Sequence, residues 1–138
     1  MNATREDVVR EALTWIGTPF HDRAWVKGAG VDCLNLIIKV YAAVGLIEDF
    51  EPPAYSAQWF QHRDEPLFLS GLEKYAHRVE MAEPGDIAMF NFGRHAAHAA
   101  IILDHYTLLH AYKPAGEVLR EPRSGHDHRL HSYWSVFP

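Results

Sequence analysis

The sequence predicts an α+β domain, with N-terminal helices packed on a C-terminal antiparallel sheet of about five strands. Two N-terminal segments, 4–17 and 32–45, repeat apolar residues at helical spacing. After residue 85 the pattern changes to alternating residues, which is typical of strands. Short turns, clearest at 113–116, favour antiparallel pairing. The 138 residues fit one domain, 1–138.

Each of the two helices has a start and a stop signal. Thr4 precedes an acidic first turn and is a good N-cap, and Gly17 ends the segment. Asp32 is the expected N-cap of the second helix, which begins at or just before Cys33 and stops at Gly45.

The other segments are assigned from the positions of Gly and Pro residues and from the spacing of apolar residues. Residues 21–32 are expected to form a surface loop, residues 46–64 look irregular, and residues 65–78 favour a further helix. The expected strands cover 87–92, 98–103, 107–112, 117–121 and 131–137.

Composition excludes several classes of protein. Thirteen Lys and Arg against eighteen Asp and Glu give a net charge of −5, which argues against a nucleic-acid-binding surface. A single cysteine excludes an intramolecular disulfide. No apolar run reaches the roughly 18 residues that cross a membrane, and the charged N-terminus is unlike a signal peptide.

Cys33 is the first candidate for chemistry. A helix N-terminus presents unpaired N–H groups, which lower the pKa of a thiol and can also bind an oxyanion. The alternative is an inert, buried cysteine in the first turn of the helix.

His98 and His110 are the candidate base and its orienting partner. A three-residue loop after Leu103 sets that residue opposite Thr107 and places both histidines on one face of the sheet. Such diagonal neighbours lie roughly 7–8 Å apart at the backbone, within reach of two imidazole rings. A two-residue loop would place them on opposite faces, and each histidine alone reads as an ordinary hydrogen-bonded strand residue.

Five segments in order carry a family resemblance. They are Gly17-Thr18-Pro19-Phe20, Gly28-Ala29-Gly30-Val31-Asp32-Cys33, Pro84-Gly85-Asp86-Ile87-Ala88-Met89-Phe90, His98-Ala99-Ala100-Ile101 and His110-Ala111. Together they resemble the NlpC family of bacterial cell-wall cysteine peptidases over almost the whole chain. The long loop before Cys33 and residues 55–69 look most like the phage-tail and gene-transfer-agent branch.

The resemblance implies a papain-like fold and hydrolysis of peptide bonds in peptidoglycan stem peptides. Cys33 would attack the carbonyl carbon, and its backbone N–H would contribute to the oxyanion hole. His98 would accept the thiol proton and return it to the leaving amine. His110 would hold the His98 ring in the useful tautomer.

The resemblance also points to substrate contacts. Asp32 occupies a position that meets a free substrate amine in the family. Leu34 and Asn35 stand where relatives commonly have Ser-Gly, and Phe20 stands where a tyrosine is common. These departures leave the nucleophile and both histidines in place, so they bear on substrate specificity and catalytic efficiency.

The expected setting follows from the same branch. The chain would be made in the bacterial cytoplasm without a signal peptide and act in the tail of a virion or phage-like particle. Its partners would be tail-tip proteins and a peptidoglycan peptide, with no nucleic acid and no membrane insertion. Neither a cofactor nor a metal is expected.

Three alternatives stay open. The chain could be a structural tail-tip subunit that keeps the peptidase fold with little or no catalysis. A zinc site could form from His126, His128 and His131, although solvated histidines are favoured in that Gly-, Asp- and Arg-rich turn. A thiol acyltransferase on the same scaffold is the third.

Overall fold

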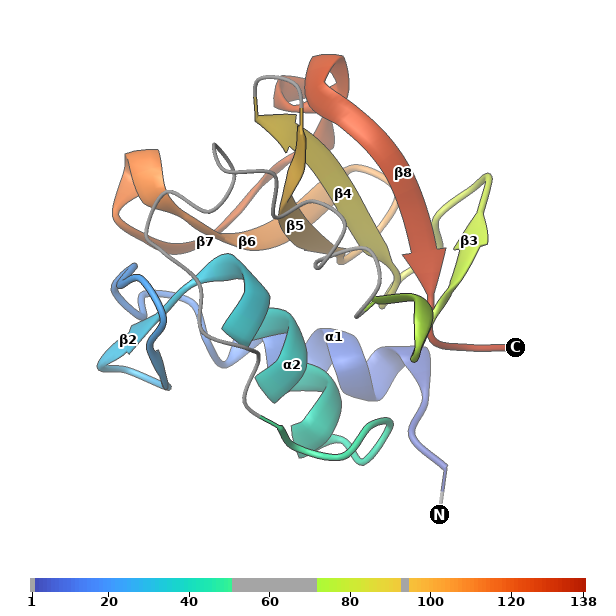
Figure 1. Cartoon of the computed structure of the whole chain (residues 1–138), viewed down its shortest axis with the longest axis horizontal. Helices are drawn as coiled ribbons and strands as arrows, with labels where there is room; N and C mark the ends of the chain where they lie inside the picture. Colours follow the sequence, from blue (N-terminus) through green and yellow to red (C-terminus); the bar gives the residue numbers. More distant parts are fainter. Residues whose placement is uncertain (1, 51–71, 93–94) are drawn as a thin grey trace.

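The computed structural model describes residues 2–50, 72–92 and 95–138, and this part of the chain has the α+β architecture that the sequence predicts (Figure 1). The helices in it are α1 (Arg5–Leu13) and α2 (Cys33–Ala43). The strands are β1 (Trp25–Val26), β2 (Gly30–Val31), β3 (His77–Val79), β4 (Ile87–Phe92), β5 (His95–Ile102), β6 (Thr107–Tyr112), β7 (Glu117–Pro122) and β8 (Leu130–Ser135). Short 3-10 turns follow β6 and β7, at Lys113–Ala115, Arg123–Gly125 and Asp127–Arg129.

Both helix starts are confirmed by their capping bonds. The Thr4 hydroxyl accepts from the Asp7 backbone N–H at 3.2 Å, and the Asp7 carboxylate accepts from the Thr4 N–H at 2.9 Å. The Asp32 carboxylate accepts from the Asn35 N–H at 2.9 Å, so α2 begins at Cys33. Gly45 follows α2 with a φ of +81°, a left-handed conformation that glycine adopts without steric cost.

The main sheet has six antiparallel strands in the order β3-β8-β4-β5-β6-β7. Strands β4 to β7 follow one another as the expected meander, whereas β8 returns to pair with β4. β3, the additional strand, lies where the sequence favoured a helix over 65–78. Residues 65–71 lie outside the described part, and residues 72–73 are helical. The strand His77–Val79, which pairs with β8, therefore replaces only the end of the expected helix.

A small hairpin corrects the expected loop over 21–32. β1 and β2 pair through Trp25 with Val31 and Val26 with Gly30. Two-residue strands are too short to show a period in the sequence, which is why the hairpin could not be predicted. Of the segment expected to be irregular, 46–64, the described part ends at residue 50.

The two faces of the sheet carry different structures. Both helices lie on one face (Figure 1), against alternate residues of β5 such as Ala99 and Ile101. The intervening residues Ala100 and Ile102 belong to a second apolar cluster on the other face. His98 has the same parity as this second set. In the described residues no helix has the length and apolar character needed to cross a membrane.

The predicted register between β5 and β6 is confirmed. Ile101 pairs with Leu109 and Ile102 with Leu108, and the Leu103 N–H donates to the Thr107 carbonyl at 3.0 Å. Pairing stops at Ile101, although β6 stays paired with β7 up to its last residue. Backbone pairing between β5 and β6 therefore ends before His98, and α2 contacts both strands.

Candidate active site

Cys33 is the first residue of α2, and its side chain lies in the core with 7% of its surface exposed. Backbone N–H groups of Ala99, Leu34 and Cys33 itself act on the sulfur and lower its pKa. The Ala99 N–H belongs to β5, next to His98, on the stretch that has no strand partner in β6. The sulfur therefore lies near the backbone of β5 at Ala99, the residue after His98.

The net effect on the thiol is opposite to the one expected from a helix N-terminus. Burial and the neighbouring Asp32 carboxylate raise the pKa of Cys33 to about 12, and the three N–H groups offset only part of that rise. The thiol is therefore protonated at neutral pH. For the sulfur to act as a nucleophile, a base must remove this proton.

His98 and His110 meet, as the strand register predicted. His98 Nε2 lies 2.8 Å from His110 Nδ1, and the ring centroids are 5.0 Å apart. His98 is 4% exposed and His110 is fully buried. Aromatic rings fix both imidazoles: Phe92 stacks on His98 at 5.1 Å, and Tyr112 stacks on His110 at 4.6 Å.

Burial keeps both histidines neutral. The pKa of His98 falls well below its usual value because of burial and then because of repulsion from His110, His126 and Arg129. Burial also lowers the pKa of His110, to about 4, although the Glu121 carboxylate opposes this shift. A neutral His98 has one unprotonated nitrogen, which is the requirement for a general base.

Two further residues extend the pair, and the sequence reasoning missed both as site residues. His110 Nε2 lies 2.8 Å from Glu121 Oε2, and His126 Nε2 lies 2.5 Å from the same oxygen. Glu121 comes from β7, where it pairs with Leu108. Residues 123–129 bring the His126 ring to within 6.0 Å of the Phe90 ring on the second face.

One signal for Glu121 was present in the sequence. The turn at 113–116 aligns β6 with β7, which places Glu121 near His110 on the same face. The position of His126 had no local signal, because it depends on the irregular connection to β8. The histidines grouped as a zinc alternative separate: His126 meets Glu121, His128 is exposed, and His131 Nδ1 lies 2.8 Å from the Ser132 hydroxyl.

The predicted substrate-contact residues lie around the start of α2. Asp32 is 4% exposed, and its second carboxylate oxygen accepts from the Arg23 N–H at 2.7 Å. Its carboxylate therefore orders the helix start and the preceding loop. Phe20 is half-buried and bridges to Val31, and the half-buried Leu34 follows the thiol in α2. Contact of these residues with a substrate remains a prediction.

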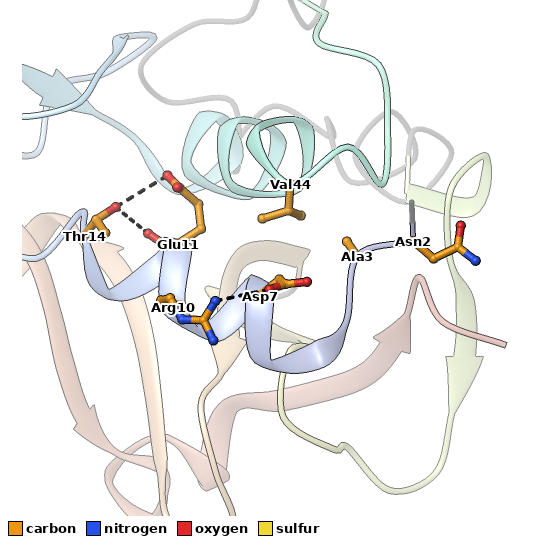
Figure 2. A pocket seen from close by; sticks show the side chains of 7 residues that line it. All are labelled: Asn2, Ala3, Asp7, Arg10, Glu11, Thr14 and Val44. Carbon is orange, nitrogen blue, oxygen red and sulfur yellow. Dashed lines mark hydrogen bonds and ion pairs between the residues drawn. The ribbon is translucent and has the colours of Figure 1, made fainter.

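A surface pocket elsewhere holds none of these residues. It lies between α1 and the end of α2, and Figure 2 shows its lining of Asn2, Ala3, Asp7, Arg10, Glu11, Thr14 and Val44. Arg10 pairs with Asp7 at 3.2 Å, and the Thr14 hydroxyl donates to the Glu11 carbonyl at 2.6 Å. These polar groups are engaged with one another, so the pocket is not assigned to the site.

No protein-family model and no curated protein matches the sequence. Solved structures do match. The chain is similar to the NlpC/p60 domain of the peptidoglycan hydrolase SagA, with a TM-score of 0.65 and 19% identity over 96% of this chain and 99% of that one. It is similar to NlpC1 from Trichomonas vaginalis, with a TM-score of 0.72 and 13% identity over 98% of this chain and 46% of that one.

A third match has no catalytic role. RipD from Mycobacterium tuberculosis, described as a non-catalytic NlpC/p60 domain protein adapted to peptidoglycan binding, gives a TM-score of 0.61 and 19% identity over 97% of each chain. At these identities the likeness concerns the fold. The helices on one face, the six-stranded antiparallel sheet and these matches together show that the chain has the papain-like fold of NlpC/p60 domains.

Proposed function

We propose that this protein is a cysteine peptidase that hydrolyses peptide bonds in bacterial peptidoglycan stem peptides. The observation that carries the proposal is the His98–His110 contact, on the strand whose Ala99 N–H acts on the helix-terminal thiol. The sequence resemblance and the peptidoglycan hydrolase among the fold neighbours supply the substrate class.

In the proposed reaction Cys33 is the nucleophile and His98 is the general base and acid. As the Cys33 sulfur attacks the substrate carbonyl carbon, its proton passes to His98 and a thioester forms once the amine leaves with that proton. Water then attacks the thioester, and His98 first accepts and then returns a proton, which releases the acid and the thiol. The backbone N–H of Cys33 lies in the first turn of α2, where N–H groups have no partner within the helix, and would donate to the oxyanion in both steps.

The site must admit substrate before this chemistry can occur. Cys33 is only 7% exposed, so a substrate carbonyl or a water molecule cannot reach its sulfur in the resting structure. Access requires either that the surrounding residues move or that the substrate enters beside the partly buried Phe20 and Leu34. We therefore expect substrate binding to be the step most sensitive to those two residues.

Purified muropeptides test the proposal. Wild-type protein is expected to release new amino groups, whereas Cys33→Ser and His98→Asn each lose at least about 100-fold in rate. Because a serine side chain is close in size to that of cysteine, the circular dichroism of the Cys33→Ser variant should be unchanged. Release of amino groups at the wild-type rate by Cys33→Ser would contradict the proposal.

Peptidoglycan binding without catalysis is the second candidate function. The raised thiol pKa favours it, and so does the likeness to the non-catalytic RipD. This alternative predicts that wild type and Cys33→Ser sediment equally with insoluble peptidoglycan and that neither releases amino groups.

We also propose that the protein acts in a phage-type tail, where it could serve structurally as well as catalytically. The sequence resemblance supports this, and the exposed Trp25 and Val26 on the β1–β2 hairpin offer apolar surface to a neighbouring tail-tip protein. Mass spectrometry of purified particles is expected to detect the chain at a fixed ratio to tail proteins, and its absence from them would exclude this setting.

A further inference from the structure

We propose that Glu121 is a positioning residue which, through His110, fixes the proton of His98 on Nε2, and that His126 holds the Glu121 carboxylate in place. The inference rests on the proposed function for its catalytic meaning. The proton positions themselves can be measured whether or not the protein hydrolyses anything.

The Glu121 carboxylate determines which nitrogen of His110 is protonated. Burial raises the pKa of Glu121, but hydrogen bonds from His110 and His126 outweigh burial and lower it below the usual value. Glu121 is therefore ionised at neutral pH and can only accept. Since His110 Nε2 lies 2.8 Å from Glu121 Oε2, that nitrogen must carry the proton.

The neutral charge of His110 determines the proton of His98 in turn. A neutral His110 with its proton on Nε2 has a lone pair on Nδ1. That lone pair lies 2.8 Å from His98 Nε2, so His98 Nε2 donates. His98 is also neutral, which leaves the lone pair on its Nδ1. The base nitrogen of His98 is thus Nδ1. The Glu121 carboxylate determines this through the hydrogen bonds that link it to His110 and His110 to His98.

His126 completes the environment of the carboxylate. Its Nε2 donates to Glu121 Oε2 at 2.5 Å, the same oxygen that accepts from His110. The His126 ring is held edge-on against His110 at 4.9 Å and against Tyr112 at 5.3 Å. The two donated hydrogen bonds hold the carboxylate against His110, and the two ring contacts hold the His126 ring that donates one of those bonds.

A metal ion is the competing explanation of the same cluster. The ligand atoms of His110, Glu121 and His126 all lie within 4.8 Å of one another. The observed 2.8 and 2.5 Å separations are hydrogen-bond distances, whereas two ligands each about 2.1 Å from a tetrahedral zinc ion lie roughly 3.4 Å apart. The geometry therefore favours hydrogen bonds.

The two explanations predict opposite proton positions. A metal on His110 Nε2 would leave the His110 proton on Nδ1, which would donate to His98 Nε2 and move the His98 proton to Nδ1. His98 could not then accept the thiol proton. The tautomer of His98 consequently separates the two.

The experiment is nitrogen NMR of protein labelled with ¹⁵N-histidine and purified without an affinity tag. We expect His98 and His110 in the wild type to carry the proton on Nε2, and addition of a chelator to change nothing. A His98 proton on Nδ1, or a spectrum that changes when a chelator removes zinc, would overturn the proposal. Because this measurement uses the wild-type protein, its result does not depend on whether any variant folds.

Variants then test the role of Glu121. Glu121→Leu removes the acceptor, so the His98 tautomer should become mixed, with kcat lowered at least about 100-fold and KM changed less than about twofold. Glu121→Gln keeps an oxygen acceptor and should retain the Nε2 proton. Glu117→Gln, an exposed residue of the same strand, is the matched control. Unchanged tautomers and kcat in Glu121→Leu would contradict the proposal. If the wild type shows the expected tautomers but cleaves no muropeptide, only the proposed function fails.

Discussion

At the scale of single residues, the pKa of the Cys33 thiol is set by opposing effects of its surroundings. Desolvation and the Asp32 carboxylate raise its pKa, while N–H groups from α2 and β5 lower it. With a pKa of about 12 the thiol is neutral at rest, so under the proposed mechanism its reactivity depends on transfer of the proton to His98. The proposed mechanism is therefore general-base catalysis rather than attack by a preformed thiolate.

Alkylation measures this balance. In the wild type the rate of iodoacetamide labelling of Cys33 should be low at pH 7 and should still be rising above pH 10. Asp32→Asn removes the negative charge and keeps a good N-cap, so labelling at a given pH should be faster. Rapid labelling of the wild type below pH 7 would show that the thiolate is already formed.

The residues also show what a sequence can and cannot reveal. The Asp32-Cys33 helix start and the facing of His98 and His110 were predictable, because one depends on a local capping bond and the other on a short loop that fixes register. The raised thiol pKa was not predictable, because it depends on how deeply the core encloses the sulfur. His126 depends on a long irregular connection, which carries no periodic signal.

At the scale of elements, α1 is tied to the start of β4 by a buried charge. Asp86 is 1% exposed and accepts from Arg5 at 2.7 Å and from the Glu83 N–H at 2.8 Å. Arg5 also donates to the Pro84 carbonyl at 3.1 Å. The pair fixes α1 against the start of β4, an inner strand of the sheet.

Removal of Arg5 should therefore be costly. Arg5→Met leaves the Asp86 charge buried without its partner, and we expect a loss of about 2 kcal/mol in the free energy of unfolding, reduced from a fully buried pair because Arg5 is partly exposed. Urea denaturation measures it. Arg10→Met, on the same helix and in exposed ion pairs, should change stability by less than about 0.5 kcal/mol. Equal losses in the two variants would show that the buried pair has no special role.

At the scale of the whole molecule, the buried histidines make folding sensitive to pH. The pKa of His110 is about 4 when folded, against 6.5 for an unperturbed histidine, so the unfolded chain binds the proton more readily. The resulting stability is complete above pH 6.5 and is lost as the pH falls toward 4. His98, whose pKa is lowered as well, acts in the same direction.

We therefore expect the free energy of unfolding to fall by roughly 3 kcal/mol between pH 7 and pH 4 through His110 alone. The slope should flatten in His110→Asn, whereas exposed His105→Asn should retain it. Urea titrations at several pH values provide the measurement. A wild-type stability that does not change over this range would mean that the pair is not buried in its neutral form.

The central claim is that the Cys33 sulfur forms a covalent bond with the acyl part of a stem peptide. Rapid acid quenching during turnover of a muropeptide, followed by digestion and mass spectrometry, tests it directly. We predict that the peptide containing Cys33 gains the mass of the acyl fragment, and that this species is missing in His98→Asn. Hydrolysis that proceeds while Cys33 stays unmodified at every quench time, and continues in Cys33→Ser, would contradict the claim.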